Sequence, residues 1–221
     1  MKPHEKRELE RLECRKSRRR EIIQAAKRLF LRKGVMETSM VDIANEAEIS
    51  RFTLYRYFSN KYELLIEVQL LLYEEMGLPL KMDPTEQVDT VEQLRRYLYG
   101  IASYLYGKPD LVRFSYTLNH LFSSAEISLY LQKRFRQRAM EQGAAIKRKN
   151  IAMIIEEGIK DGSFRDDIDP KETTILMIET VWGLVGKLLN SQNHPIWGHD
   201  VDHLKLLCSL VDVLVDHIKA E

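Results

Sequence analysis

Residues 38–61 constrain the fold of this chain more than any other segment, because they carry the pattern of two short helices joined by a tight turn. Small and apolar residues recur at helical spacing in the first half, which gives that helix one apolar face. These residues are Met40, Ile43, Ala44 and Ala47. Ser39 can accept a backbone N–H at the start of the helix, and Asp42 follows three residues later, as in a capping box. The pattern predicts a short helix that ends in a turn over residues 46–49.

The second half of the segment predicts a helix with one buried face and one face suited to DNA. Ser50 is placed to cap this helix, and Leu54 and Phe58 form its buried face. The other positions carry the residue types that contact phosphates and base edges. They are Arg51, Thr53, Tyr55, Arg56 and Tyr57. A polar break at residues 59–60 precedes a further helix, so we interpret the segment as a helix-turn-helix with its recognition helix second.

This segment and its flanks resemble the tetracycline-repressor (TetR) family of bacterial transcriptional regulators. The matching residues lie between positions 30 and 65: Phe30, Gly34, Thr38, Ser39, Asp42, Ile43, Ala44, Ala47, Ile49, Ser50, Thr53, Leu54, Tyr55, Tyr57, Phe58, Lys61, Leu64 and Leu65. Two positions depart from the family pattern. Glu48 stands where the family usually has Gly, which predicts a less relaxed turn or another backbone shape. Phe52 stands where Gly, Lys or Pro is common, and it either contacts a thymine methyl or fills space.

The resemblance implies an all-α fold with a three-helix DNA-binding head and a helical body for ligand binding and dimerisation. We expect a charged N-terminal extension at 1–17, the head at 18–65 and the body at 66–221. Tyr57 and Lys61 are the expected phosphate anchors, with Thr38 or Ser39 on the facing helix. The full set of expected DNA contacts is Arg18, Arg19, Thr38, Ser39, Ser50, Arg51, Phe52, Thr53, Tyr55, Arg56, Tyr57 and Lys61.

The charge distribution supports a DNA-facing N-terminal part. Residues 1–61 carry sixteen Lys and Arg against nine Asp and Glu, a net charge of +7. Residues 62–221 carry eighteen Lys and Arg against twenty-four Asp and Glu, a net charge of −6. A basic end beside an acidic body is typical of nucleic-acid-binding proteins, and its affinity depends on salt.

Residues 1–17 are almost entirely charged, and an isolated helix of this kind is marginal in water. We therefore predict a mobile or fraying extension that leads into a helix at 18–33. Gly34 is placed to end that helix. The basic residues of 15–20 either contact DNA or form a solvated tail.

Beyond residue 61 the apolar residues recur with a helical period, and no stretch alternates with the period of a strand. The expected helices span about 61–77, 91–106, 109–122, 124–160, 171–190 and 200–219.

The last two helices are apolar over more of their surface than one core stripe needs. Leu206, Leu210 and Val213 widen the stripe of the second, and Gly183 would let another helix approach the first. The helices are either fully buried core or a two-fold dimer surface, and we favour the dimer. The expected interface residues are Val181, Val185, Leu188, Leu207, Val211 and Leu214.

The body carries aromatic and Met residues on the helices that line the effector cavity in similar regulators. Each of these residues either lines a cavity or belongs to the core. The candidates are Tyr97, Tyr104, Phe114, Leu118, Phe122, Met153, Met177 and Trp182. This lining is mostly apolar and aromatic, so we expect a largely hydrophobic or aromatic ligand. No isolated charge on an apolar face marks an obvious counter-ion.

Other chemistry is weakly represented. The chain contains no phosphate-binding glycine loop, no GxSxG and no HExxH motif, so we expect no enzyme activity and no cofactor. The densest metal-like group is too poor in well-spaced ligands to predict a metal site. Its residues are His194, His199, Asp200, Asp202 and His203. The chain has no apolar run of membrane-spanning length and only two cysteines, which fits a reducing cytoplasm.

Three functions remain open. The favoured one is a dimeric repressor that binds a near-palindromic double-stranded DNA operator and responds to a small molecule. The second is an all-helical enzyme or small-molecule-binding protein whose basic head is incidental. The third is a DNA-binding protein that has no ligand. The residues of the recognition helix and the uneven charge favour the first.

Overall fold

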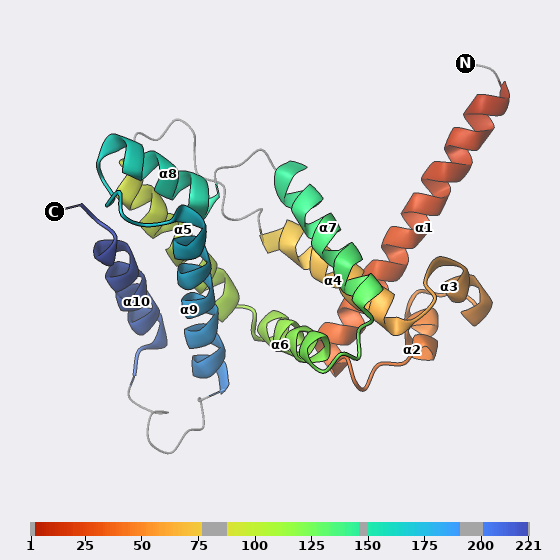
Figure 1. The fold of residues 1–221 in the computed structure, drawn as a ribbon. Coiled ribbons are helices and arrows are strands. Elements are labelled where there is room, and N and C mark those ends of the chain that lie inside the picture. Colours follow the sequence, from red (N-terminus) through yellow and green to blue (C-terminus); the bar gives the residue numbers. More distant parts are fainter. Residues whose placement is uncertain (1–2, 77–87, 146–149, 191–200, 221) are drawn as a thin grey trace. The chain divides into compact units, whose positions relative to one another are not determined.

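The computed structural model describes residues 3–76, 88–145, 150–190 and 201–220 (Figure 1). Ten helices make up most of these residues, and the extended pairing found among them is an isolated bridge between Phe164 and Lys219. The helices are α1 (Pro3–Lys33), α2 (Met40–Glu46), α3 (Arg51–Tyr57), α4 (Lys61–Met76), α5 (Thr90–Tyr106), α6 (Pro109–Ser123), α7 (Leu129–Ala145), α8 (Ile151–Asp161), α9 (Pro170–Asn190) and α10 (His203–His217). The predicted all-α fold is confirmed. Within the described ranges, no helix has the length and apolar character that a bilayer crossing requires.

The chain divides into two compact units. The first contains Met1–Glu74 and Arg113–Gly143, and the second contains Glu75–Val112 and Ala144–Glu221. The boundary that we expected after residue 65 falls inside the continuous helix α4, and the first unit also includes most of α6 and most of α7. The units therefore do not coincide with the expected head and body.

The first unit is organised around α1 and α4. The apolar face of α1 is buried, and Phe30 on this face stacks on Phe114 of α6 with ring centroids 6.0 Å apart. Helix α4 is buried on several sides, because α1 and α7 both contribute partners to it. Its buried apolar residues are Leu64, Leu65, Ile66, Val68, Leu70 and Leu72.

The charged N-terminal extension is helical and continuous with α1, contrary to our expectation of a fraying segment. Its side chains are exposed, and charged residues pair four apart along it, as His4 does with Glu8 and Lys6 with Glu10. Such pairs support a helix only weakly. The decisive difference from an isolated peptide is that the packed part of α1 already provides the nucleus, so each added residue extends an existing helix.

The single long helix expected at 124–160 is replaced by α7 and α8. Ser128 precedes α7, and its hydroxyl accepts a hydrogen bond from the Leu131 N–H. Asn150 caps α8, where its side chain accepts from the Met153 N–H at 3.0 Å. Both caps satisfy backbone donors that a continuous helix would have paired with carbonyls.

The second unit is built around α5, which packs against α8, α9 and α10. Its buried residues Leu94, Leu98, Ile101 and Leu105 lie on one face, as the helical period predicts. A polar contact adds to this packing, because Arg95 of α5 donates to Asp212 of α10 at 2.5 Å. Tyr99 also donates to Asp212, at 2.6 Å, and burial together with this hydrogen bond raises the pKa of Tyr99 to about 12.

Helix α8 ends at Gly162, which has a φ of +79°, and the chain then folds back. The Phe164 ring lies so close to Gly158 that a Cβ at Gly158 would be 2.0 Å from it. Residues at the C-terminal end pair with this turn, because Arg165 N–H donates to Ile218 O at 3.0 Å and Ala220 N–H donates to Ser163 O at 3.1 Å.

Candidate nucleic-acid interface

Helix α2 is positioned by a capping box at its first turn. The Ser39 hydroxyl accepts from the Asp42 N–H at 3.1 Å, and the Asp42 carboxylate accepts from the Ser39 N–H at 2.9 Å. These hydrogen bonds from Ser39, and next the contact with Lys33, lower the pKa of Asp42 to about 2. The predicted capping box is confirmed, and the Ser39 hydroxyl is largely occupied by it.

Ion pairs tie α2 to α1. Arg28 donates to Glu46 at 2.8 Å, Arg32 lies 3.4 Å from the same carboxylate, and Lys33 lies 3.2 Å from Asp42. The hydrogen bond from Arg28 is the main cause of the lowered pKa of Glu46. Single surface ion pairs contribute little stability, but this group fixes the orientation of α2 against α1.

The turn between α2 and α3 uses a left-handed residue. Glu48 has a φ of +52°, its N–H donates to Asn45 O, and the next N–H, of Ile49, donates to Ala44 O. A side chain in this conformation is disfavoured by about 1–2 kcal/mol, which explains why Gly is usual in the family at this position. Of the two expected alternatives, the structure shows the strained form of the usual turn.

Helix α3 buries one face and exposes the other. The Ser50 hydroxyl caps it by accepting from the Thr53 N–H at 3.1 Å, and it shares a further hydrogen bond with the Thr53 hydroxyl. Leu54 and the following Phe58 are buried completely or nearly so. The outward face carries four exposed side chains: Arg51, Phe52, Tyr55 and Arg56.

Phe52 is the most telling residue on this face because 80% of its surface is exposed. It therefore does not fill space inside the fold, which was one of the two interpretations of its position. Beside it, the Arg56 guanidinium lies 5.6 Å from the centre of the half-buried Tyr57 ring. The outward face thus combines cationic, aromatic and hydroxyl groups on a single short helix.

Two expected DNA contacts, Thr38 and Lys61, bind backbone carbonyl groups of the protein instead. Thr38 is 1% exposed, and its hydroxyl donates to Gly34 O at 2.6 Å. The Lys61 ammonium donates to the carbonyl oxygens of Val35 and Thr38 at 2.9 and 3.1 Å. These groups close the loop between α1 and α2, which leaves the Thr38 hydroxyl no access to DNA.

Arg19 also has a structural role in this fold. Its guanidinium pairs with the buried Glu67 of α4 at 2.9 and 3.1 Å and lies 4.9 Å from the centre of the Phe58 ring. Arg18, the other arginine that we expected at DNA, is exposed and pairs with Glu21 at 2.7 Å. The two adjacent arginines therefore face different surroundings.

Glu67 is the main residue that sequence reasoning missed. It is 6% exposed inside the apolar stretch of α4, so the expectation of no isolated charge on an apolar face was wrong. The signal was visible, because a charged residue interrupts an otherwise apolar helix. Its partners Arg19 and Arg138 were not visible, since Arg138 lies on α7, 71 residues along the chain.

The residues expected to line a ligand cavity are distributed over both units. Phe114, Leu118 and Phe122 belong to the first unit, and the other five belong to the second. Phe114, Leu118 and Met177 are buried core residues, whereas Met153 is 44% exposed. Half-buried side chains complete the set: Tyr97, Tyr104, Phe122 and Trp182.

Most of the residues expected at a dimer interface are buried against their own chain. Val181, Val185, Leu188, Leu207 and Val211 are at most 7% exposed, and Leu214 is half-buried. They form the inner faces of α9 and α10. The outer faces carry other apolar residues, namely Ile175, Leu176, Leu204, Leu206 and Val213.

Three members of the metal-like group, His194, His199 and Asp200, lie outside the described residues. Of its other members, Asp202 caps α10, and His203 contacts Tyr106 with Nδ1 3.1 Å from the phenol oxygen. No cluster of three potential metal ligands occurs among the residues that the structure describes.

A capped helix pair whose second helix presents exposed basic and aromatic side chains defines a helix-turn-helix DNA-binding protein. Residues 22–68 match the family described as "Bacterial regulatory proteins, tetR family". The chain belongs to this TetR family, and it is a transcriptional regulator rather than an enzyme.

Similarity to known regulators extends beyond the matched segment. The chain is 25% identical over 173 residues to the probable regulator ArpR of Pseudomonas putida, covering 77% of this chain and 80% of that protein. It is 23% identical over 167 residues to the repressor KstR2 of Mycobacterium tuberculosis, covering 75% of this chain and 78% of that protein. A putative TetR-family regulator of Vibrio parahaemolyticus has the same fold, with a TM-score of 0.66, 22% identity and coverage of 91% and 98%. Bacillus subtilis FadR, solved in complex with stearoyl-CoA, matches with a TM-score of 0.61 and 21% identity, covering 90% of this chain and 98% of that chain.

Proposed function

We propose that this regulator is a homodimeric repressor that binds a near-palindromic operator and is released from it by a small, largely hydrophobic ligand. The observation that carries the proposal is the outward face of α3, where Arg51, Phe52 and Tyr55 are exposed beside a fully buried inner face. An exposed Phe is unfavourable in water, and contact with a thymine methyl in the major groove would remove it from solvent.

The same face would supply both base and phosphate contacts. Arg51 and Arg56 can donate two hydrogen bonds each to guanine or to phosphate oxygens. Tyr55 and the half-buried Tyr57 add hydroxyl donors near the end of the helix. Because the N-terminal 61 residues carry a net charge of +7, non-specific attraction to the DNA backbone supports these contacts.

The DNA-binding proposal is tested by fluorescence anisotropy with duplexes from the region upstream of the gene and with a random duplex. We expect specific affinity to exceed random affinity by at least about a thousandfold at physiological salt. Arg51→Ala should reduce that ratio without changing stability. Equal affinity of the parent for both duplexes would reject sequence-specific recognition.

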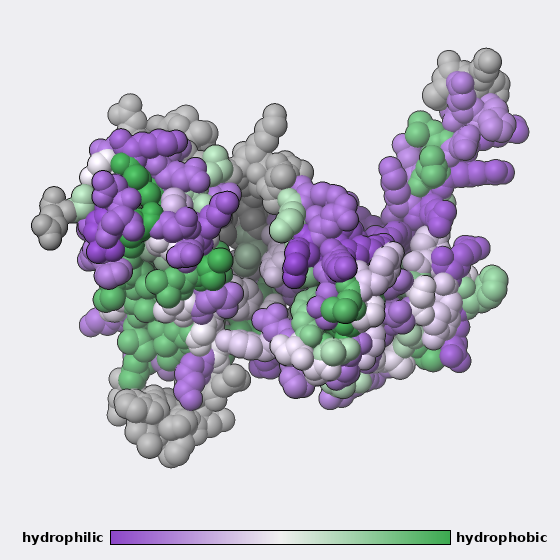
Figure 2. Space-filling view, viewed as in Figure 1, coloured by the Kyte–Doolittle hydropathy of each residue, from purple (hydrophilic) through white to green (hydrophobic). Residues whose placement is uncertain are grey.

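The outer faces of α9 and α10 support the homodimer. Leu206 and Val213 are 40% and 66% exposed and lie on one side of α10, and Leu176 on α9 is 58% exposed. Gly183, also on α9, has open space where a Cβ would be, so a partner helix can approach closely. Figure 2 shows hydrophobic residues gathered over these two helices. Exposed apolar faces on two adjacent helices suit a second copy of the chain.

The dimer is tested by light scattering and by sedimentation. Val213→Asp should shift the protein to a monomer, because it would bury an unpaired charge at the interface. Leu129→Asp is a matched control, since Leu129 on α7 is 73% exposed in the other unit. A parent protein that is monomeric at micromolar concentration contradicts the proposal.

The ligand response is supported by half-buried aromatic residues in the second unit, of which Trp182 is the best reporter. Bacillus subtilis FadR, which has a similar fold, was solved with stearoyl-CoA. Ligand should quench or shift Trp182 fluorescence and weaken DNA binding by roughly 5- to 150-fold, the usual size of such coupling. Trp182→Ala should blunt the response and leave ligand-free DNA affinity unchanged. If a broad apolar library neither raises the melting temperature nor releases DNA, the regulator works without such a ligand.

A further inference from the structure

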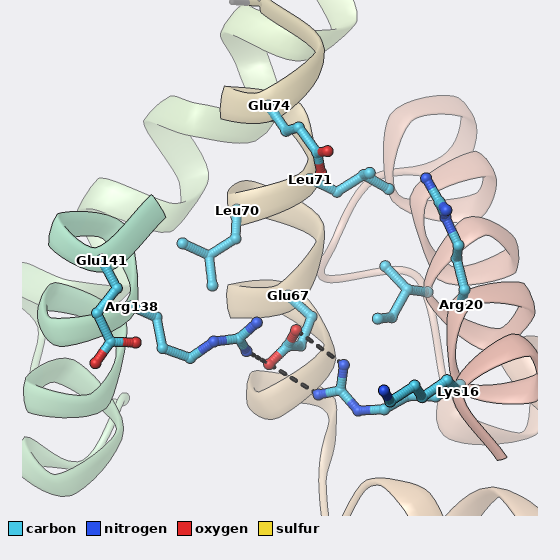
Figure 3. Close-up of a pocket in the computed structure, with 10 residues that line it drawn as sticks. Lys16, Arg20, Glu67, Leu70, Leu71, Glu74, Arg138 and Glu141 are labelled. Atoms are coloured by element: carbon cyan, nitrogen blue, oxygen red, sulfur yellow. Dashed lines mark hydrogen bonds and ion pairs between the residues drawn. The ribbon is translucent and has the colours of Figure 1, made fainter. Parts of the chain in front are cut away.

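A buried ionic cluster joins three helices of the first unit. Glu67 of α4 is 6% exposed, and two guanidinium groups bind its carboxylate. Arg19 of α1 approaches it with two nitrogens, at 2.9 and 3.1 Å, and Arg138 of α7 contacts it from the opposite side. Figure 3 shows the Glu67 side chain between Arg138 and the helix that carries Lys16.

The cluster carries more positive than negative charge. Two cations share one carboxylate, although each guanidinium is partly withdrawn from solvent. Burial lowers the pKa of both arginines, and the neighbouring charge of Arg19 lowers that of Arg138 further. The carboxylates of Glu63, near Arg19, and of Glu141, near Arg138, act in the opposite direction. The Arg19 and Arg138 side chains keep 34% and 38% of their surface exposed, which weakens the repulsion between the two charges without removing it. A second anion beside them would therefore be favourable.

A cavity opens directly onto this cluster. Its volume is about 610 Å³, within the range of small-molecule sites. Helix α1 lines it with the basic residues Lys16 and Arg20 and with the apolar Ile23, and α4 lines it with Leu70 and Leu71. Figure 3 shows Leu70 and Leu71 on the helix that carries Glu67, and Lys16 and Arg20 on the neighbouring helix.

The lining favours a single negative charge. Four basic residues (Lys16, Arg19, Arg20 and Arg138) face three acidic ones (Glu67, Glu74 and Glu141), which leaves one excess positive charge. A polyanion would be repelled by the acidic residues, and a neutral molecule would leave the excess cation uncompensated.

We propose that this cavity binds a small organic monoanion. The charged group lies between Arg19 and Arg138, and the apolar part lies against Ile23, Leu70 and Leu71. None of the residues expected to line a ligand cavity belongs to this site. The charged N-terminal extension contributes to it through Lys16, which gives part of that helix a binding role.

The site lies close to the helix-turn-helix formed by α2 and α3. Arg19 is on the helix that holds α2, and it also covers the Phe58 ring beneath the recognition helix. An anion that competes with Glu67 for Arg19 would alter the position of α1 against α4. This consequence for DNA binding rests on the proposed function, whereas binding of the anion does not.

The binding is tested without DNA, by calorimetry with hexanoate and its neutral isostere hexanamide at constant ionic strength. Hexanoate should bind the parent protein at least about tenfold more tightly than hexanamide, the effect of one charged hydrogen-bonded contact. Arg138→Gln should remove that difference. Arg136→Gln is the matched control, because Arg136 is exposed on the same helix and does not line the cavity.

Two further variants keep the test decisive if Arg138→Gln folds poorly. Arg20→Gln changes only an exposed cation of the wall and should weaken hexanoate severalfold. Glu67→Gln removes the competing carboxylate and should tighten hexanoate binding, an effect that a purely structural cluster would not produce. The proposal is overturned if hexanoate and hexanamide bind equally, or if hexanoate does not bind at about 20 mM, on the order of the weakest useful affinity. It is also overturned if Glu67→Gln and Arg20→Gln leave the hexanoate affinity unchanged. DNA release by hexanoate is measured separately, so its failure leaves the binding result intact.

Discussion

The ammonium of Lys61, the first residue of α4, donates a 2.9 Å hydrogen bond to the carbonyl oxygen of Val35 in the loop that follows α1. A second hydrogen bond, to Thr38 O, fixes the same loop just before the capping box of α2. A residue that the motif marks as a phosphate anchor therefore also holds the head together. Variants of the head must be judged by stability and DNA affinity together.

Replacing Lys61 by Met should lower the free energy of unfolding by about 1–3 kcal/mol, because two carbonyl groups lose their donor while the aliphatic stem is kept. Urea unfolding followed by fluorescence measures the change. Lys6→Met, in the exposed part of α1, should change stability by less than about 0.5 kcal/mol. The competing outcome is that Lys61 is only a phosphate anchor, as the sequence predicts. In that case stability would not change, and the salt dependence of DNA affinity would fall by about one unit of slope.

Glu48→Gly should stabilise the protein by about 0.5–1 kcal/mol, because Gly adopts the left-handed conformation without strain but loses more chain entropy on folding. Thermal unfolding is the measurement. Glu48→Ala retains the Cβ that causes the strain, so it should give no such gain. A loss of stability in Glu48→Gly would show that the Glu48 side chain makes a favourable contact that outweighs the backbone strain.

The capping carboxylate of Asp42 should make the head sensitive to acid. Its pKa is about 2 in the fold and 3.8 as the ordinary value, so the deprotonated form favours folding. The stabilisation is complete above the ordinary pKa and is lost as the pH falls towards 2. Asp42→Asn should therefore be less stable than the parent at pH 5, and the difference should vanish near pH 2. An NMR titration that places the Asp42 carboxyl at its ordinary pKa would contradict this.

Phe52→Ala should weaken operator binding by about fivefold or more, because the apolar contact of at least one methyl-sized group is lost. Binding to random DNA and the melting temperature should not change, since the side chain is 80% exposed in the free protein. Met36→Ala, which removes another exposed apolar side chain from the first unit, is the control in the same anisotropy assay. A large loss of stability in Phe52→Ala would mean that the ring packs inside the fold.

The local features of the head could be read from the sequence because each depends on residues close together in the chain. Ser39 and Asp42 are three residues apart, and so are Ser50 and Thr53, and both caps are present. The buried positions of α3 followed from the helical period. Gly34 has a φ of +93°, as a residue that ends a helix in the left-handed conformation requires.

The same reasoning failed where a distant residue decides the outcome. The extension at 1–17 is helical because the packed half of α1 supplies the nucleus. The apolar stripes of α9 and α10 were identified, but the stripes that face inward cannot be told from those that face outward without the position of α5. The residues chosen for the interface were therefore mostly the buried ones.

The sequence by itself determined that this protein is all-helical, that it carries a helix-turn-helix and that it belongs to the TetR family, because helix periods, caps and motif spacing are local properties. Only the tertiary structure decided which cations remain available to a partner. Lys61 reaches a carbonyl 26 residues away, and Arg19 reaches a carboxylate 48 residues away. Long charged side chains bind wherever the fold brings an acceptor, so their roles are set by packing and not by position in the motif.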